Sequence, residues 1–126
     1  MSTIKDKNLA TIGQQEVDWA ARQMKVLEEI KTEFSSSKPL NGLSIGACMH
    51  VTKETANLML TLKAAGANVA LCASNPLSTK DSVAAYLSEN DIEVHAVHGV
   101  SNDDFFKHLN SVLDTKPDIT MDLSLI

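Results

Sequence analysis

The sequence predicts an α/β fold: a three-layer, Rossmann-like parallel sheet of about four strands with flanking helices, preceded by an N-terminal amphipathic helix. Two observations lead to this prediction. Apolar residues recur at helical spacing in some segments and form short continuous runs in others. The two kinds of segment alternate along the chain, and strands that alternate with helices typically build a parallel sheet covered by helices on both faces.

The first helix is expected over residues 14–34, where apolar side chains recur every three or four positions. These side chains are Val17, Ala20, Ala21, Met24, Leu27, Ile30 and Phe34. The polar stretch "SSSKPLNG" that follows contains proline and glycine and indicates a turn or linker. We therefore expect residues 1–41 to hold a helix and a linker, and residues 42–126 to hold the α/β domain, the two forming one structural unit.

Short apolar runs bounded by turn residues are typical of buried strands. They predict strands near residues 43–48, 68–73, 93–97 and 118–122.

Helical patterns separate these runs and have recognisable ends. They cover residues 52–65, 79–89 and 101–114. Gly66 is a natural stop for the first of them, and Ser101 is the expected N-cap of the last. Asp81 is expected to be a helix-start residue.

Composition excludes several classes of protein. The formal net charge of −5 and the pI near 5.2 argue against nucleic-acid binding through a basic face. The apolar runs are too short to span a membrane, and the N-terminus lacks the apolar core of a secretory signal. Cys48 and Cys72 lie in strand-like runs without metal-ligand spacing. We therefore expect a cytoplasmic protein with two buried, reduced thiols.

Polar residues gather where two predicted strands end. His50, Thr52 and Glu54 follow the first strand, and residues 75–81 follow the second. Ligands of parallel α/β sheets bind in the loops beyond the carboxyl ends of the strands. The sequence therefore predicts a ligand site at this edge.

The same segments resemble a known family. The motifs are "HVTKETA" at 50–56, "GANV" at 66–69 and "NPLSTKD" at 75–81, with "IGQQEVDWAARQMKVL" and "SKPLNG" upstream. In this order they resemble the substrate-binding domain of S-adenosylhomocysteine hydrolase (adenosylhomocysteinase), over nearly the whole chain. Together with the strand–helix alternation, the resemblance implies the strand order 3-2-1-4.

The chain also departs from the family pattern. Family members are several times longer and continue into a glycine-rich NAD-binding domain, whose fingerprint is absent from these 126 residues. Of an acidic pair near the end, Asp122 remains, and Leu123 stands where the second aspartate is expected. We therefore expect an N-terminal fragment that ends in an unrelated tail, as a frameshift, a truncated gene or a mis-assembled reading frame would each give. Residues 42–126 would then be a partial substrate-binding domain.

The resemblance implies roles for individual residues. His50 would act as acid or base near the 5′ leaving group, since imidazole exchanges a proton near neutral pH. Thr52 and Glu54 would hold the adenine edge. The polar residues of the second loop would line the homocysteine end, and the remaining member of the acidic pair would contact the substrate. These residues are Asn75, Ser78, Thr79 and Asp122.

Each role has a purely structural alternative. His50 could be a half-buried histidine that caps a carbonyl, and Thr52 and Glu54 could be the N-cap and first-turn acid of a helix. The loop around Pro76 could owe its residues to turn formation. His95 and His98 are expected to be structural or surface residues, and His108 to lie on a helix face.

The family activity is the reversible hydrolysis of S-adenosylhomocysteine to adenosine and homocysteine, with NAD as cofactor and a homo-oligomer as the working form. We expect this chain to bind no NAD, to be inactive alone, and to bind adenosine or S-adenosylhomocysteine weakly. Two alternatives stay open: a stand-alone nucleoside-binding module, and an interaction protein that modulates a full-length hydrolase.

Overall fold

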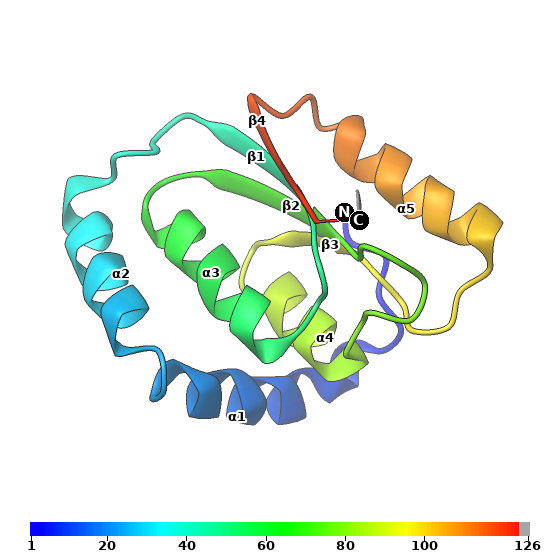
Figure 1. The fold of residues 1–126 in the computed structure, drawn as a ribbon, viewed down its shortest axis with the longest axis horizontal. Helices are drawn as coiled ribbons and strands as arrows, with labels where there is room; N and C mark the ends of the chain where they lie inside the picture. Colours follow the sequence, from blue (N-terminus) through cyan, green and yellow to red (C-terminus); the bar gives the residue numbers. More distant parts are fainter. Residues whose placement is uncertain (124–126) are drawn as a thin grey trace.

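Four parallel strands form the sheet in the order β3-β2-β1-β4, as predicted (Figure 1). The structure is a computed structural model and describes residues 1–123. The strands are β1 (Ser44–Cys48), β2 (Asn68–Cys72), β3 (Glu93–His95) and β4 (Ile119–Asp122). They lie within one or two residues of the predicted positions. The expected unrelated tail begins at Leu123, and its last three residues, 124–126, lie outside the described residues.

Helices cover the two faces of the sheet unequally (Figure 1). On one face, α3 and α4 pack against the strands, and α1 packs outside both of them, while α2 packs against α3. Within residues 1–123, α5 is the one helix that covers the other face. The helices are the 3-10 turn η1 (Lys7–Leu9), α1 (Ala10–Ala21), α2 (Lys25–Ser37), α3 (Lys53–Ala64), α4 (Asp81–Glu89) and α5 (Asn102–Leu113).

The prediction of one continuous helix over residues 14–34 was wrong, because the chain turns between α1 and α2. Backbone bonds from Gln23 to Ala20 (2.9 Å) and from Met24 to Ala21 (3.1 Å) tighten the end of α1. Met24 then leaves the helical region, with φ −114° and ψ 58°. The break lets α1 bury Val17 against the core, whereas α2 has no buried residue. Apolar spacing continued through this short turn and concealed it.

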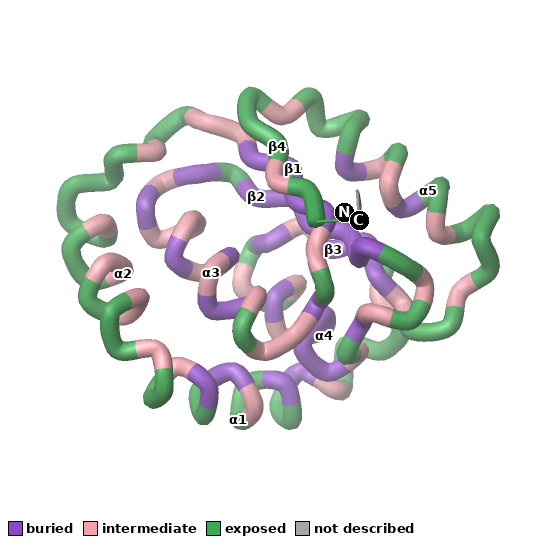
Figure 2. Tube along the Cα trace, viewed as in Figure 1, coloured by how far each residue is buried: buried purple, intermediate pink, exposed green. Residues whose placement is uncertain are grey.

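The two faces of the sheet are built from side chains of different size. Towards α3 and α4 the strands bury Ile45 and Leu71, in one cluster with Met59 of α3. Figure 2 shows buried stretches along the strands, α3 and α4. Towards α5, β1 and β2 present small residues, and a Cβ added at Gly46 would lie 3.0 Å from Pro117 and 3.1 Å from a Val112 methyl. Glycine in β1 therefore lets α5 and the loop after it approach the sheet closely.

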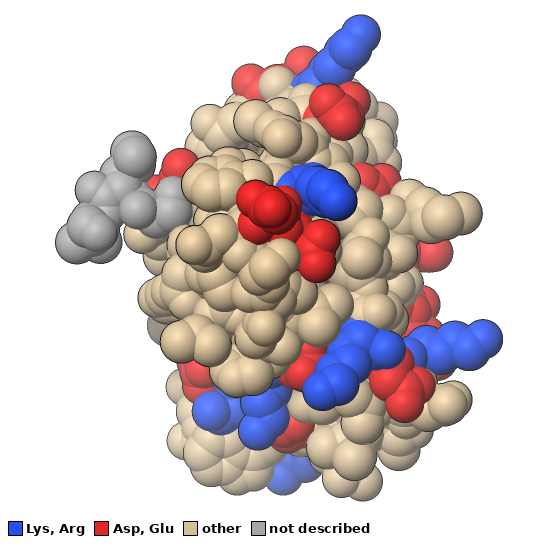
Figure 3. All heavy atoms as spheres, turned by 90° about the vertical axis from the view of Figure 1, so that its right-hand side faces the viewer, with Lys and Arg blue, Asp and Glu red and all other residues tan. Residues whose placement is uncertain are grey.

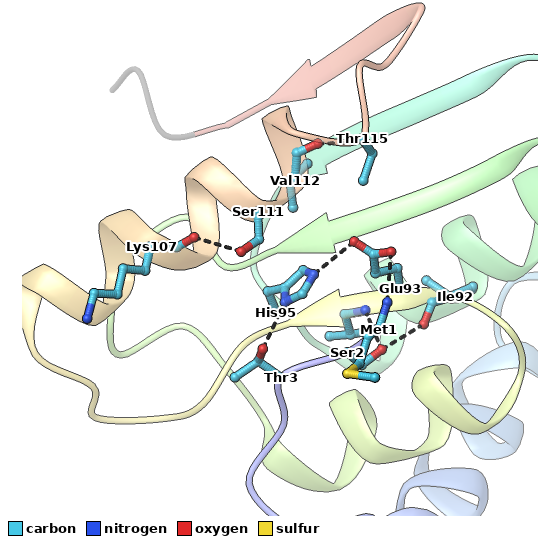
Figure 4. Close-up of polar contacts among 11 residues, drawn as sticks. Met1, Ser2, Thr3, Ile92, Glu93, His95, Lys107, Ser111, Val112 and Thr115 are labelled. Atoms are coloured by element: carbon cyan, nitrogen blue, oxygen red, sulfur yellow. Dashed lines mark hydrogen bonds and ion pairs between the residues drawn. The ribbon is translucent and has the colours of Figure 1, made fainter.

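The first residues of the chain close the β3 edge of the sheet. We call residues 1–4 the N-terminal strap. Thr3 donates its N–H to the Val94 carbonyl (2.8 Å) and accepts the N–H of Ala96 (2.9 Å), as a short parallel strand would. Its hydroxyl lies 3.0 Å from Nδ1 of His95, and Nε2 of that ring lies 2.9 Å from Oε2 of Glu93 (Figure 4). His95 is therefore a buried structural residue.

The surface shows no large area of one charge on the side drawn in Figure 3, where basic and acidic side chains are interspersed. Among residues 1–123, no helix is long and apolar enough to cross a membrane. Cys48 and Cys72 are buried thiols, as expected.

Candidate functional site

Two strand ends bring His50 and Ser74 together. Each lies two residues beyond the end of its strand, β1 or β2, and the two strands are register partners. Nδ1 of His50 lies 2.7 Å from the Ser74 hydroxyl, in a hydrogen bond whose direction depends on the imidazole tautomer. Ser74 is buried and His50 is exposed, so a fixed hydroxyl orients a ring that solvent can reach.

The loop after β2 is tied back to the segment after β1. Val51 donates its N–H to the Ser78 carbonyl (2.8 Å) and accepts the N–H of Lys80 (2.9 Å). The Ser78 hydroxyl lies 3.3 Å from that of Ser74 and accepts the N–H of Asn75 (3.2 Å). These bonds hold both loops in one arrangement around the imidazole.

A cleft of about 330 Å³ opens between these loops and the loop that follows β3. It is lined by His50, Thr52, Leu77, Ser78, Thr79, Lys80 and His98. Four of the predicted site residues therefore share one cleft.

Thr52 and Glu54 occupy the positions that helix formation requires. The Thr52 hydroxyl accepts the N–H of Thr55 (3.4 Å) and caps α3, while Glu54 is the acid of its first turn. The Glu54 carboxylate lies 3.2 Å from Nζ of Lys53, and its side chain is 54% exposed. Lys53 in turn lies over the Trp19 ring, 5.8 Å from its centroid. Glu54 does not line the cleft but lies beside its rim, on the same helix start.

Two other predicted residues also lie outside the cleft lining. The Asn75 side chain accepts the N–H of Leu77 (2.9 Å), which closes a turn within the loop. Asp122 ends β4 opposite Cys48, at the same sheet edge as His50. It lines a different, smaller pocket beneath α5.

Thr79 carries the polar group that the surrounding protein leaves unsatisfied. The residue is 7% exposed, and its hydroxyl has no hydrogen-bond partner among the described residues. A buried hydroxyl without a partner is costly, so this group calls for an explanation such as an ordered water or a bound ligand.

Two residues of the site were missed in the sequence. Ser74 orients His50, and His98 lines the cleft from the loop after β3. That loop is fixed by bonds from His98 N–H to the Asp81 carboxylate (3.0 Å) and from Gly99 N–H to the Pro76 carbonyl (2.8 Å). The rule that ligands bind beyond strand ends could have indicated Ser74, which follows β2 by two residues, whereas the position of His98 depends on these loop contacts.

The cleft suits polar recognition of a small molecule. Its imidazole, hydroxyl and amine groups can donate and accept hydrogen bonds, and one nitrogen of the His50 ring is held in place by the Ser74 hydroxyl. No group of three potential ligands among the described residues could hold a metal ion. The turn from β1 to α3 contains no glycine, and Thr52 already caps the helix, so it does not fit the pyrophosphate of a dinucleotide.

Comparison with known proteins gives one consistent result. The family model of S-adenosyl-L-homocysteine hydrolase matches residues 1–125. The adenosylhomocysteinase of Aquifex aeolicus is 49% identical over 120 residues, which cover 94% of this chain and 29% of that protein. The enzymes of Sulfolobus acidocaldarius (47% over 119 residues; 94% and 29%) and Pyrococcus abyssi (44% over 119 residues; 94% and 28%) are similar. The chain thus spans less than a third of the length of these relatives.

Proposed function

The chain belongs to the S-adenosyl-L-homocysteine hydrolase family, and on this premise we propose that it supplies one wall of a site for S-adenosylhomocysteine. The reaction served by that site is hydrolysis of the thioether nucleoside to adenosine and homocysteine. The observation that carries the proposal is the hydrogen bond between His50 and Ser74 at the mouth of the cleft.

His50 is proposed to move the proton at the 5′ end of the nucleoside. A thioether leaving group must gain a proton as homocysteine departs, and an incoming water must lose one. An imidazole can do both near neutral pH. The Ser74 hydroxyl engages Nδ1, which leaves Nε2 for the substrate.

The second loop is proposed to hold the homocysteine end. Ser78 and Thr79 line the cleft, and the unsatisfied Thr79 hydroxyl could donate to a carboxylate or accept from an ammonium group. Asn75 supports this end through its turn, and its exposed amide nitrogen extends the polar rim.

The start of α3 is proposed to hold the nucleobase. Thr52 lines the cleft, and Glu54 stands beside it with an exposed carboxylate. A carboxylate only accepts hydrogen bonds, which suits the exocyclic amino group of adenine. To contact the base, Glu54 must give up its ion pair with Lys53 and accept a hydrogen bond from the ligand instead. Asp122 is proposed to approach the substrate from the end of β4, at the same sheet edge.

We propose that NAD, on which the family reaction depends, is not held by the residues described here, because the β1–α3 turn does not fit it. Side chains cannot replace a hydride acceptor, so the chain alone should be inactive. A cytoplasmic location is proposed too, supported by the two buried thiols.

The experiment that tests the proposal is an NMR titration of the ¹⁵N-labelled chain with adenosine and with S-adenosylhomocysteine. We expect millimolar-class binding, because one wall of a pocket offers only part of the contact surface. Shifts should centre on His50, Thr52, Ser78 and Thr79. S-adenosylhomocysteine should also move residue 75, which adenosine should leave unchanged.

Other outcomes of this titration are equally informative. If saturating ligand shifts residues elsewhere and leaves the cleft unmoved, the proposed site is wrong. A micromolar constant would favour a stand-alone nucleoside-binding module instead. In parallel, release of homocysteine from S-adenosylhomocysteine and NAD should be undetectable with a thiol reagent, and turnover that survives repurification would contradict the predicted inactivity.

A further inference from the structure

Cys48 and Cys72 lie side by side in the sheet. They are direct register partners on the neighbouring parallel strands β1 and β2. Because side chains alternate along a strand, both point to the face covered by α5, where they pack with Ala70 and Val112. Figure 4 shows α5 passing above these strands. The two side chains are therefore neighbours on the same face of the sheet.

The two thiols are in contact. The Cys72 thiol is hydrogen-bonded with Cys48, and this bond, with burial and the nearby charge of Asp122, strongly raises the pKa of Cys72. The Cys48 thiol also donates to the Ala73 carbonyl (3.4 Å). A charged product at this position would be penalised by the same burial and by the same carboxylate.

A pocket leads to the pair from the side. It has a volume of about 160 Å³ and runs between α5 and the β1–β4 edge. Cys48 lines it together with Gly46, Leu109, Val112, Leu113 and Asp122. Cys48 is 6% exposed and Cys72 is 0% exposed, so a reagent would meet Cys48 first and its neighbour second.

We propose that Cys48 and Cys72 form a two-thiol site for trivalent arsenic compounds. With phenylarsine oxide, the arsenic–oxygen bond and two S–H bonds break and two arsenic–sulfur bonds form. Both protons leave with the oxygen as one molecule of water, and arsenic stays trivalent. The product is a neutral dithioarsenite that bridges β1 and β2.

The charge of the product favours arsenic over a metal ion at this position. The arsenic adduct is neutral, whereas a bis-thiolate complex of a monovalent metal ion would keep a negative charge beside Asp122.

The site is coupled to the cleft by position. Cys48 lies two residues before His50, and Cys72 lies two residues before Ser74. A bridge between the thiols would therefore fix the spacing of the strand ends that carry the hydrogen bond between His50 and Ser74. This coupling holds whether or not the cleft binds the proposed substrate.

The test uses the folded 126-residue chain, phenylarsine oxide and intact-mass spectrometry. We expect one phenylarsenic group per chain, with loss of one water, which ethanedithiol removes and an equal concentration of the monothiol glutathione does not. Cys48→Ser and Cys72→Ser should each weaken the apparent affinity for phenylarsine oxide by about a hundredfold, because a variant with one thiol cannot form the second arsenic–sulfur bond. Cys48→Ala and Cys72→Ala repeat the test in case a buried serine unfolds the chain.

Two results would overturn the proposal. One is an adduct that forms only in denaturant. This would show that the two thiols only pack the core and are inaccessible to the reagent in the folded chain. The other is an equal adduct on the wild type and both single variants. A readout independent of mass is the His50 ring signal, which should shift on arsenic binding in the wild type and not in either variant.

Discussion

His50 and His95 lie at the same carboxyl edge of the sheet and differ in every surrounding contact. His95 is 5% exposed, and both of its ring nitrogens are engaged, one by the Thr3 hydroxyl and the other by Glu93. His50 is exposed, and one nitrogen is held by Ser74. A ring with both nitrogens bound within the protein serves the fold. A ring held at one nitrogen and exposed to solvent can contact a ligand without disturbing the fold.

The largest difference is expected when each ring is removed. His95→Ala should lower the free energy of unfolding by about 2–3 kcal/mol, since it empties a buried site and ends the bonds to Thr3 and Glu93. His50→Ala should change it by less than about 0.5 kcal/mol, as is usual for an exposed side chain. Urea denaturation of both variants measures this. Similar losses of unfolding free energy in the two variants would contradict the distinction between a structural His95 and an exposed His50.

Low pH should destabilise the fold through the buried histidines. Burial, and then the charge of His95, lowers the pKa of His108, whose ring centroid lies 6.5 Å from that of His95. Below about pH 6.5 the unfolded chain therefore takes up a proton that the folded chain resists, and stability falls as pH falls. We expect a melting temperature about 3–6 °C lower at pH 5 than at pH 7. His108→Phe, which cannot titrate, should flatten this dependence, and an unchanged slope would contradict it.

Glu93 should make stability depend on pH in a second range, below that of His108. Desolvation acts to raise its pKa, but hydrogen bonds from His95 and the Met1 amine outweigh it, so the pKa of Glu93 is lowered. The stability it contributes is present above its ordinary pKa of about 4.5 and is lost as pH falls below that value. Glu93→Gln should remove this part of the acid sensitivity in a pH-dependent melting series, while Glu89→Gln should leave it in place.

The exposed His50 ring should contribute to ligand binding and have little effect on the stability of the fold. His50→Asn keeps a hydrogen-bonding group near Ser74 but cannot carry a proton at neutral pH. In an NMR titration followed at Ser78 and Thr79, the affinity for adenosine should fall about threefold. The melting temperature should stay unchanged. His98→Asn serves as the matched change on the opposite side of the cleft. A larger loss there would make His98 the more important ring.

The smallest effect is expected at the nucleobase. Glu54 should favour adenosine over inosine, because the hypoxanthine carbonyl would face a carboxylate oxygen. At 54% exposure, water and Lys53 screen this repulsion, so we expect a preference of about two- to fivefold. Glu54→Gln should bring the ratio of the two dissociation constants close to one. If wild type already binds both equally, Glu54 serves only the helix.

Strand positions were predictable from the local sequence, whereas the strand order also needed the strand–helix alternation and the family resemblance. The runs that became β1 and β2 are continuous apolar segments ended by turn residues. The break between α1 and α2 was not predictable in this way. Apolar spacing continues from Val17 through Met24 to Leu27, and only packing against α3 decides that the chain turns.

The site was predictable where strand ends define it. His50, Thr52, Ser78 and Thr79 meet in the cleft as their positions after β1 and β2 indicated. His98 could not be placed by its own neighbours, because its loop is set by distant bonds to Asp81 and Pro76. The pairing of Glu54 with Lys53 likewise depends on side-chain orientation, which residue spacing does not report.

The N-terminal strap has a consequence for the order of folding. Thr3 pairs with residues 94–96, so its partners lie more than ninety positions later in the sequence. Contacts this far apart in sequence form late, because the intervening chain must be ordered first. During synthesis the strap is made well before β3, and the edge of β3 stays open until the strap returns to it. Closure of this edge by the strap is therefore a late step of folding.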